Sequence, residues 1–155
     1  MDAPKIRRGT ERRRFSQERL SNQLLALSMM AAQMVCEPLV PRVSTERLLR
    51  VSKSIARGYR ASRLPAPSAE RLVAQAEIAK QMVPWQVECV AESLVLWTFL
   101  RAGGHPAVLQ VGCRNILGHV EAHLWVELSG RVLLDEHNEA RTWHSFERPL
   151  AGGED

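Results

Sequence analysis

The hydrophobic pattern of this chain changes its period once, at Gly103-Gly104, and that change limits the folds open to it. Before the two glycines, apolar residues recur every three or four positions, which is the spacing of a helix face. After them, residues 121–128 alternate between polar and apolar side chains, as in a half-buried strand. Helices grouped before strands favour an α+β fold. The predicted helices cover residues 16–36, 45–59, 68–82 and 88–102.

Capping and turn residues mark the ends of these predicted elements. Ser16 and Ser68 can each accept a hydrogen bond from the first turn of the helix that follows. Ser129-Gly130 is a two-residue turn after the alternating stretch, so we expect a β-hairpin over residues 121–135. A short apolar run predicts a further strand over 107–112. The fold is therefore expected to be an N-terminal helical layer and a last helix packed on a small antiparallel sheet.

The 155 residues suit one domain with a helical preamble. The first residues are basic and contain Pro4 and Gly9, so they are expected to be disordered. The last residues have no apolar pattern. The predicted organisation is a basic disordered tail over 1–15, a helical region over 16–83, an α+β core over 84–150 and a flexible tail over 151–155.

The formal net charge of +4 is concentrated in the first twenty residues and in residues 42–63. Such runs attract acidic partners. No aromatic-interleaved basic motif and no zinc-finger spacing accompanies them, so nucleic acid is not an expected partner. Residues 12–15 loosely resemble a twin-arginine export signal, but the polar residues that follow do not form its apolar region. No apolar stretch reaches the length of a membrane span, so the expected location is the cytoplasm.

The three cysteines are too few for a disulfide framework, and their odd number fits a reducing compartment. Cys36 lies near the C-terminal end of an apolar helix, and Cys113 follows a glycine at a predicted strand end. Packing is the expected role of both thiols. Cys89 differs, because it begins the predicted helix 88–102. The first turn of a helix offers free N–H groups and the positive end of its dipole, which favour a thiolate.

The order of Cys89, His123 and Asp135 fits a nucleophilic site. A strand histidine beside the thiolate can pair with it and later protonate the leaving amine. An aspartate on the return strand of the hairpin can bond the far ring nitrogen and fix its tautomer. Neighbouring strands would present the last two side chains side by side.

Two other interpretations of these residues stay open. Cys89 could be a small buried side chain, and the chain a non-catalytic domain that binds a peptide or acts as an adaptor. A zinc site is the other interpretation, because residues four apart on a strand share a face. Its ligands would be Cys113, His119, His123 and His137.

The second half of the chain resembles a known family along a set of spaced residues. The strongest block is Ala122-His123-Leu124-Trp125-Val126-Glu127. The other matching residues are Pro84-Trp85, Cys89, Ser93-Leu94, Leu100-Arg101, Gly104, Pro106-Ala107, Val111-Gly112 and Gly130-Arg131-Val132. Over residues 84–150 the chain resembles the leader peptidase of lasso-peptide biosynthesis, the second half of the maturation B protein. That family belongs to the transglutaminase-like cysteine proteases.

The resemblance implies a transglutaminase-like, papain-like core in which Cys89 is the nucleophile and His123 the base. It implies Asp135 as the third catalytic group, with Glu136 as the substitute. No cofactor or metal is implied. The substrate would be a lasso-peptide precursor, cut between leader and core. A transglutaminase-like acyltransferase or another small cysteine hydrolase would use the same residues.

The resemblance also implies protein partners. They are a separate leader-recognition protein and the macrolactam cyclase that acts next. The broad apolar face of residues 20–35 and the basic residues Arg12, Arg13, Arg14 and Arg19 are the expected docking features for the first partner.

Overall fold

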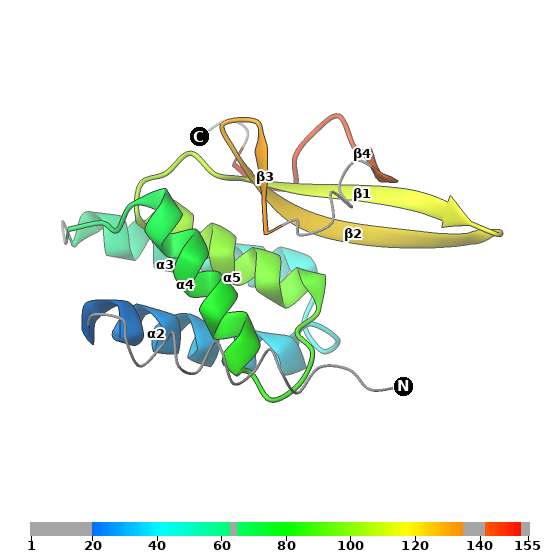
Figure 1. Cartoon of the computed structure of the whole chain (residues 1–155). Coiled ribbons are helices and arrows are strands. Elements are labelled where there is room, and N and C mark those ends of the chain that lie inside the picture. Colours follow the sequence, from blue (N-terminus) through cyan, green and yellow to red (C-terminus); the bar gives the residue numbers. More distant parts are fainter. Residues whose placement is uncertain (1–19, 63–64, 135–141, 153–155) are drawn as a thin grey trace.

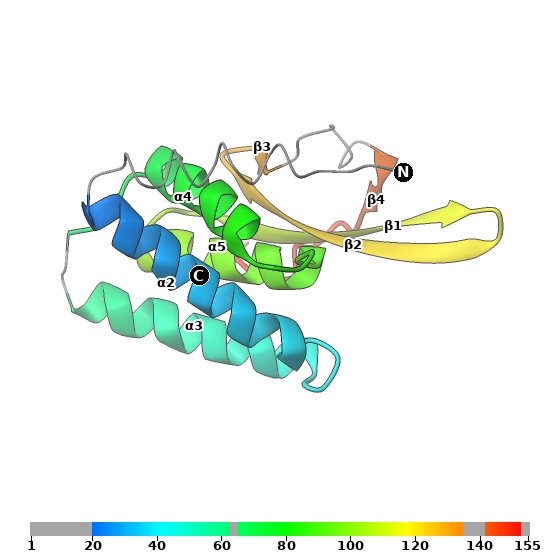
Figure 2. The ribbon, with the colours of Figure 1, turned by 60° about the horizontal axis from the view of Figure 1, so that its bottom comes forward.

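In the computed structural model, the described residues are 20–62, 65–134 and 142–152. Within these ranges, four α-helices and a short 3-10 helix precede a four-stranded antiparallel sheet. Figures 1 and 2 show the helices gathered on one side of the sheet. The predicted α+β fold is thus confirmed. The predictions for residues 1–15, for the cap Ser16 and for the tail beyond Gly152 lie outside the described residues.

The helices begin and end close to where the capping residues place them. Ser68 is confirmed as a cap, because its hydroxyl oxygen accepts a hydrogen bond from the Arg71 N–H at 3.3 Å. Glycine at 103 and 104 follows the last helix, as the pattern predicts. The helices are α2 (Leu20–Cys36), η1 (Glu37–Leu39), α3 (Thr45–Ala61), α4 (Ala69–Met82) and α5 (Cys89–Ala102).

The sheet has the strand order β3-β2-β1-β4. Its strands are β1 (Val108–Ile116), β2 (His119–Leu128), β3 (Arg131–Leu133) and β4 (His144–Ser145). The turn Ser129-Gly130 joins β2 to β3 as predicted, and both residues have positive φ angles of 52° and 75°. The predicted strand 107–112 is longer than expected and forms most of its pairs with β2.

The long β1–β2 hairpin is the main feature that the sequence pattern missed. Its turn is Leu117-Gly118, with φ angles of 51° and 89°. This is the conformation of a type I′ turn, which asparagine and glycine normally occupy and leucine rarely does. The Asn115 side-chain oxygen accepts a hydrogen bond from the Gly118 N–H at 2.9 Å and supports the turn. A leucine in that position hides the turn from any analysis based on residue type.

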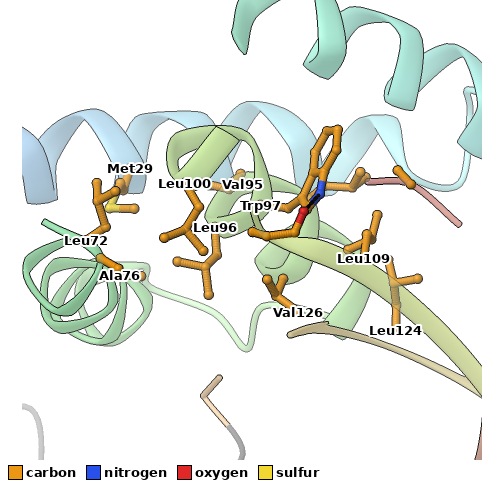
Figure 3. Close-up of a cluster of buried hydrophobic side chains, with 14 of the residues drawn as sticks. Met29, Leu72, Ala76, Val95, Leu96, Trp97, Leu100, Leu109, Leu124 and Val126 are labelled. Atoms are coloured by element: carbon orange, nitrogen blue, oxygen red, sulfur yellow. Dashed lines mark hydrogen bonds between the residues drawn. The ribbon is translucent and has the colours of Figure 1, made fainter. Parts of the chain in front are cut away.

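Helix α5 lies at the centre of the molecule, between the other helices and the sheet. Its buried residues Leu94, Leu96 and Leu100 belong to one core cluster. Figure 3 shows this cluster, in which side chains of α2 and α4 meet α5 on one side and strand residues meet it on the other. The members from the other elements include Met29, Leu72, Ala76, Leu109, Leu124 and Val126.

A buried hydrogen bond ties α5 to the start of the sheet. The indole N–H of Trp97 donates to the carbonyl of Ala107 at 3.1 Å, and Trp97 is almost fully buried. Burial of the Trp97 N–H without a hydrogen-bond acceptor would cost free energy. The bond therefore holds Ala107 beside α5, directly before the first residue of β1. One continuous core therefore joins the helical region to the sheet, across the predicted boundary at residue 84.

Candidate active site

Cys89 is the first residue of α5, and its side chain is half-buried. The preceding residue, Glu88, is the N-cap and is exposed. The Glu88 side chain makes no capping hydrogen bond to the helix. The first-turn N–H groups of α5 are therefore left without a carboxylate cap from that residue.

A second carboxylate reaches the start of α5 from η1. Both Glu37 oxygens lie 3.2 Å from the Glu88 backbone nitrogen, which donates to them. This bond satisfies an N–H just before the helix and joins η1 to α5. Residue spacing does not indicate that Glu37 contacts the start of α5, because Glu37 lies 51 positions away from Glu88 in the chain.

One turn further along α5, Ser93 joins the helix to β2. Its hydroxyl donates to the Leu124 carbonyl at 2.9 Å, and the bond is buried. Ser93 lies four residues after Cys89, on the same side of the helix and about 6 Å along its axis. Leu124 directly follows His123 in β2. The structure thus brings the first turns of the Cys89 helix to the part of β2 that carries His123.

His123 is half-buried, and its backbone lies opposite Gly112 of β1. Its ring stacks with two indoles. The ring centroid of Trp143 lies 5.0 Å away and that of Trp125 lies 6.0 Å away, each at an interplanar angle of 24°. Such offset stacks restrict the rotation of the central ring. His123 therefore has a defined orientation, imposed by one neighbour on its own strand and by one from the C-terminal segment.

Side chains alternate between the two faces of β2, because successive residues of a strand point in opposite directions. Leu124 and Val126 pack into the core with α5. The other face carries polar and aromatic side chains, and we call it the polar face of β2. It consists of Glu121, His123, Trp125 and Glu127.

Hydrogen bonds and ion pairs hold the two ends of the polar face. At one end, the Trp125 N–H donates to Glu127 Oε1 at 2.8 Å. At the other end, Arg114 of β1 pairs with Glu121, with nitrogen–oxygen distances of 3.0 and 2.9 Å. The Arg114 guanidinium also lies 4.1 Å above the ring of Trp143. The histidine is thus the centre of a row of rings with an ion pair at its edge.

The other predicted site residues stand as follows. Asp135 and Glu136 lie outside the described residues, so the third catalytic group stays a prediction. The pairing of the Cys89 thiol with the His123 ring also stays a prediction, and by strand alternation the His123 ring lies on the β2 face opposite to Leu124 and Val126, which pack with α5. Cys36 is half-buried near η1, and its burial, followed by the charge of Glu37, raises the pKa of its thiol. A raised pKa makes Cys36 a poor nucleophile, which agrees with the packing role expected for it.

The zinc hypothesis is wrong for its described ligands. Cys113 lies opposite Ala122 and His123 lies opposite Gly112, so the Cys113 and His123 side chains point to opposite faces of the sheet. His119 shares a face with His123 but lies about 13 Å from it along the strand. In the described part of the chain, no group of three or more potential ligands lies together. His137 is not among the described residues.

Sequence reasoning missed Trp143 and Arg114 as parts of the site. Trp143 belongs to a segment with no apolar period, and the two-residue strand β4 that follows it pairs with β1 of the hairpin. Arg114 stands directly opposite Glu121 in the β1–β2 register. A correct prediction of the turn Leu117-Gly118 would have paired these two residues, because the turn sets the register.

The comparison with protein families gives one match. Residues 33–148 match the family described as the transglutaminase-like superfamily. No match was found among the curated proteins or among the solved structures. In the described ranges, none of the helices combines the length and the apolar character needed to cross a membrane. Because the match covers more than half of the sequence and includes α3, α4, α5 with Cys89 and β2 with His123, the chain belongs to the transglutaminase-like superfamily.

Proposed function

We propose that this protein is a cysteine peptidase that removes the leader from a lasso-peptide precursor. The observation that carries the proposal is the position of Cys89, at the uncapped start of α5, inside a match to a superfamily of typically cysteine-dependent enzymes. The bond from Ser93 to Leu124 brings that helix end to the histidine strand. The resemblance of residues 122–127 to the lasso leader peptidases supports the substrate class.

In the proposed reaction, the Cys89 thiolate attacks the carbonyl carbon of the bond between leader and core. The His123 imidazolium gives its proton to the leaving amine of the core peptide, and a thioester with the leader remains. Neutral His123 then takes a proton from water, and the hydroxide formed hydrolyses the thioester. Asp135 would hold the imidazole tautomer through both steps. The three free thiols of this chain suit a reducing compartment such as the cytoplasm, where Cys89 stays reduced.

The test is cleavage of the precursor peptide by the purified protein and by Cys89→Ala. We expect the folded variant to lose about 10⁴-fold or more in rate. Cys113→Ala is the matched control, because its half-buried thiol belongs to strand β1 and not to a helix start, and it should cleave normally. Product masses that show addition of water support a peptidase. Transfer of the leader to an added amine would favour the acyltransferase alternative, and cleavage by folded Cys89→Ala would contradict both.

For the partner, we propose that the leader-recognition protein docks in a groove between α2 and α3. Helix α2 contains no charged residue, yet Leu20, Leu24 and Val35 are 72%, 57% and 63% exposed. Such a helix would be unfavourable in water if its outer face stayed uncovered. Two adjoining cavities of about 390 and 460 Å³ lie along it and share the lining residues Ile55, Thr98 and Phe99. Together they form an apolar trough that can hold a helix face.

The charges around this groove favour an acidic occupant. Among the described lining residues of the two cavities, the charged one is Arg71. Helix α3, which forms one wall, carries five basic residues and one acidic residue. A second copy of this chain would bring like charges together. An amphipathic helix with large apolar side chains and flanking carboxylates complements both the apolar lining of the groove and the basic charge around it.

Ile55→Glu tests the groove, because Ile55 lines both cavities and is 57% exposed. We expect weaker binding of the leader-recognition protein, and slower processing only when that partner presents the leader. Leu117→Glu is the control, since Leu117 lies at the hairpin tip and is 97% exposed. Equal affinity of the Ile55→Glu variant and the wild type would contradict this docking site. The cyclase would then act on the released core.

A further inference from the structure

The C-terminal segment places an aromatic ring on the proposed catalytic base. We propose that Trp143 is a positioning residue, which holds the His123 ring in its working orientation by stacking, and that Arg114 holds Trp143 in turn. This inference rests on the proposed function, because the proposed function gives His123 its chemical role. It assigns a specific task to a residue outside the predicted Cys-His-Asp triad.

The geometry of the stack favours a positioning role for Trp143. Trp143 is closer to the His123 ring than Trp125 is, at 5.0 Å against 6.0 Å, and it covers the ring from another segment of the chain. Trp125 alone would restrict the imidazole less, so the ring could leave its stacked orientation more easily. Two stacked indoles restrict the imidazole to a narrower range of orientations than one indole does.

Trp143 is itself held in place by Arg114. Arg114 lies over its ring at 4.1 Å, and the guanidinium is anchored by Glu121 on the facing strand. Arg114 is also 3.5 Å from the Thr142 hydroxyl, which is next to Trp143 in the chain. A cation over an indole contributes about 0.5–1 kcal/mol at exposed sites and more when the pair is desolvated.

The indole N–H of Trp143 carries a free-energy cost. The indole nitrogen of Trp143 is buried and has no hydrogen-bond acceptor among the described residues. A buried unpaired N–H costs about 1–3 kcal/mol. A phenylalanine would provide a ring for the stack without this cost. A tryptophan that keeps an unsatisfied N–H beside the proposed base is therefore better explained by the wide face of its ring than by fold stability.

Gly112 shows that the backbone makes room for this arrangement. A Cβ at Gly112 would lie 2.8 Å from the Trp125 ring and 2.9 Å from the His144 carbonyl oxygen. Position 112 stands opposite His123 in the register, so a side chain there would compete with the Trp125 ring for space beside the histidine strand. The absence of a side chain lets β4 approach β1, and β4 directly follows Trp143.

For the proposed reaction, the stack serves the imidazolium as well as the neutral ring. The electron-rich faces of two indoles stabilise a cation placed between them. The imidazolium forms when the thiol gives up its proton, and it must keep its orientation until the amine leaves. A misplacement of about 1 Å can cost about 100-fold in rate, so loose packing of this ring would lower kcat more than it raises KM.

The test compares Trp143→Leu with Trp143→Phe in the full-length protein. The leucine variant should lower kcat for precursor cleavage about 10- to 100-fold with KM little changed. The phenylalanine variant should recover most of that loss, because it restores a ring to the stack. Phe146→Leu is the matched control, since Phe146 lies in the same segment, is 53% exposed and is outside the stack. It should behave as the wild type does.

A second measurement reports the stack without any substrate. In the NMR spectrum of histidine-labelled protein, the His123 ring protons should be shifted upfield by the two indoles, and Trp143→Leu should remove much of that shift. If Trp143→Leu keeps the wild-type kcat, or leaves the His123 resonances unmoved, the positioning role is wrong. That result differs from failure of the proposed function, in which the wild type does not cleave or folded Cys89→Ala does.

Discussion

The two faces of β2 differ in chemistry although they share one backbone. On one face, Leu124 and Val126 are buried against α5 and belong to the core. On the polar face, His123 and Trp125 stack with each other, and Trp125 donates a hydrogen bond to Glu127. The two-residue period of a strand allows the fold to use one face for stability and the other for chemistry. Substitutions on the two faces should therefore have separable effects.

The largest expected effect is on the polar face. His123→Ala should lower cleavage of the precursor by about 10⁴-fold, because the nucleophile and base act as one unit, and the double variant with Cys89→Ala should be little worse. Thermal unfolding should stay close to that of the wild type, since His123 is only half-buried. His119→Ala is the control on the same face, and it is exposed. Loss of activity in His119→Ala with normal activity in His123→Ala would show that the base is wrongly assigned.

The neighbouring residue on the other face should show the opposite pattern. Leu124→Ala removes a buried side chain from the core and should lower the free energy of unfolding by about 2–5 kcal/mol. Urea unfolding measures this change, while kcat of the folded protein should stay near the wild-type value. Val120→Ala shares the strand and the face but is 74% exposed, so it should be nearly neutral. A large loss of kcat in folded Leu124→Ala would mean that the two faces are not separable.

Gly112→Ala should affect both faces together. The added Cβ would overlap the Trp125 ring and the His144 carbonyl, so the ring or β4 must move. We expect a loss of about 1–3 kcal/mol in the free energy of unfolding, together with slower cleavage. Gly58→Ala in α3 is the control, because nothing lies within 4 Å of a Cβ there and a helical glycine is itself unfavourable. Wild-type stability and activity in Gly112→Ala would remove the argument for a close approach at this position.

The smallest effect is expected from Glu121→Gln, which removes the ion pair at the edge of the polar face. Both partners are partly exposed, so the pair should contribute about 0–1 kcal/mol and less at high salt. Arg114 should remain over Trp143, and cleavage should fall only slightly. Measurements of stability and kcat at low and high ionic strength check this. A loss as large as that of Trp143→Leu would show that the charge itself acts in the reaction.

Much of the helical half could be predicted from the sequence because its signals are local. Ser68 begins α4 and the glycines after Ala102 end α5, and each acts within one helical turn of the residue concerned. The same local reasoning placed Cys89 at a helix start and His123 on a strand. It failed at the Leu117-Gly118 turn, because leucine is rare at positive φ and its conformation depends on the hairpin around it.

The functional neighbours of the site depend on contacts between distant segments. Glu37 reaches the start of α5 from η1, and Trp143 reaches His123 through the short strand β4. Neither residue belongs to a periodic pattern that points to the site. Pairing of this kind follows from the register of β1 with β2 and from packing on α5, which no local signal specifies.

The sequence by itself determined which elements form and which residues carry thiol, imidazole and indole groups, because period and caps act over a few neighbouring positions. Only the tertiary structure decided which residues from distant segments face one another. The β1–β2 register set Gly112 opposite His123, and the room left by that glycine let Trp125 and the segment of Trp143 close around the ring. Such an arrangement arises only when segments far apart in the chain share one core and one hydrogen-bonded sheet.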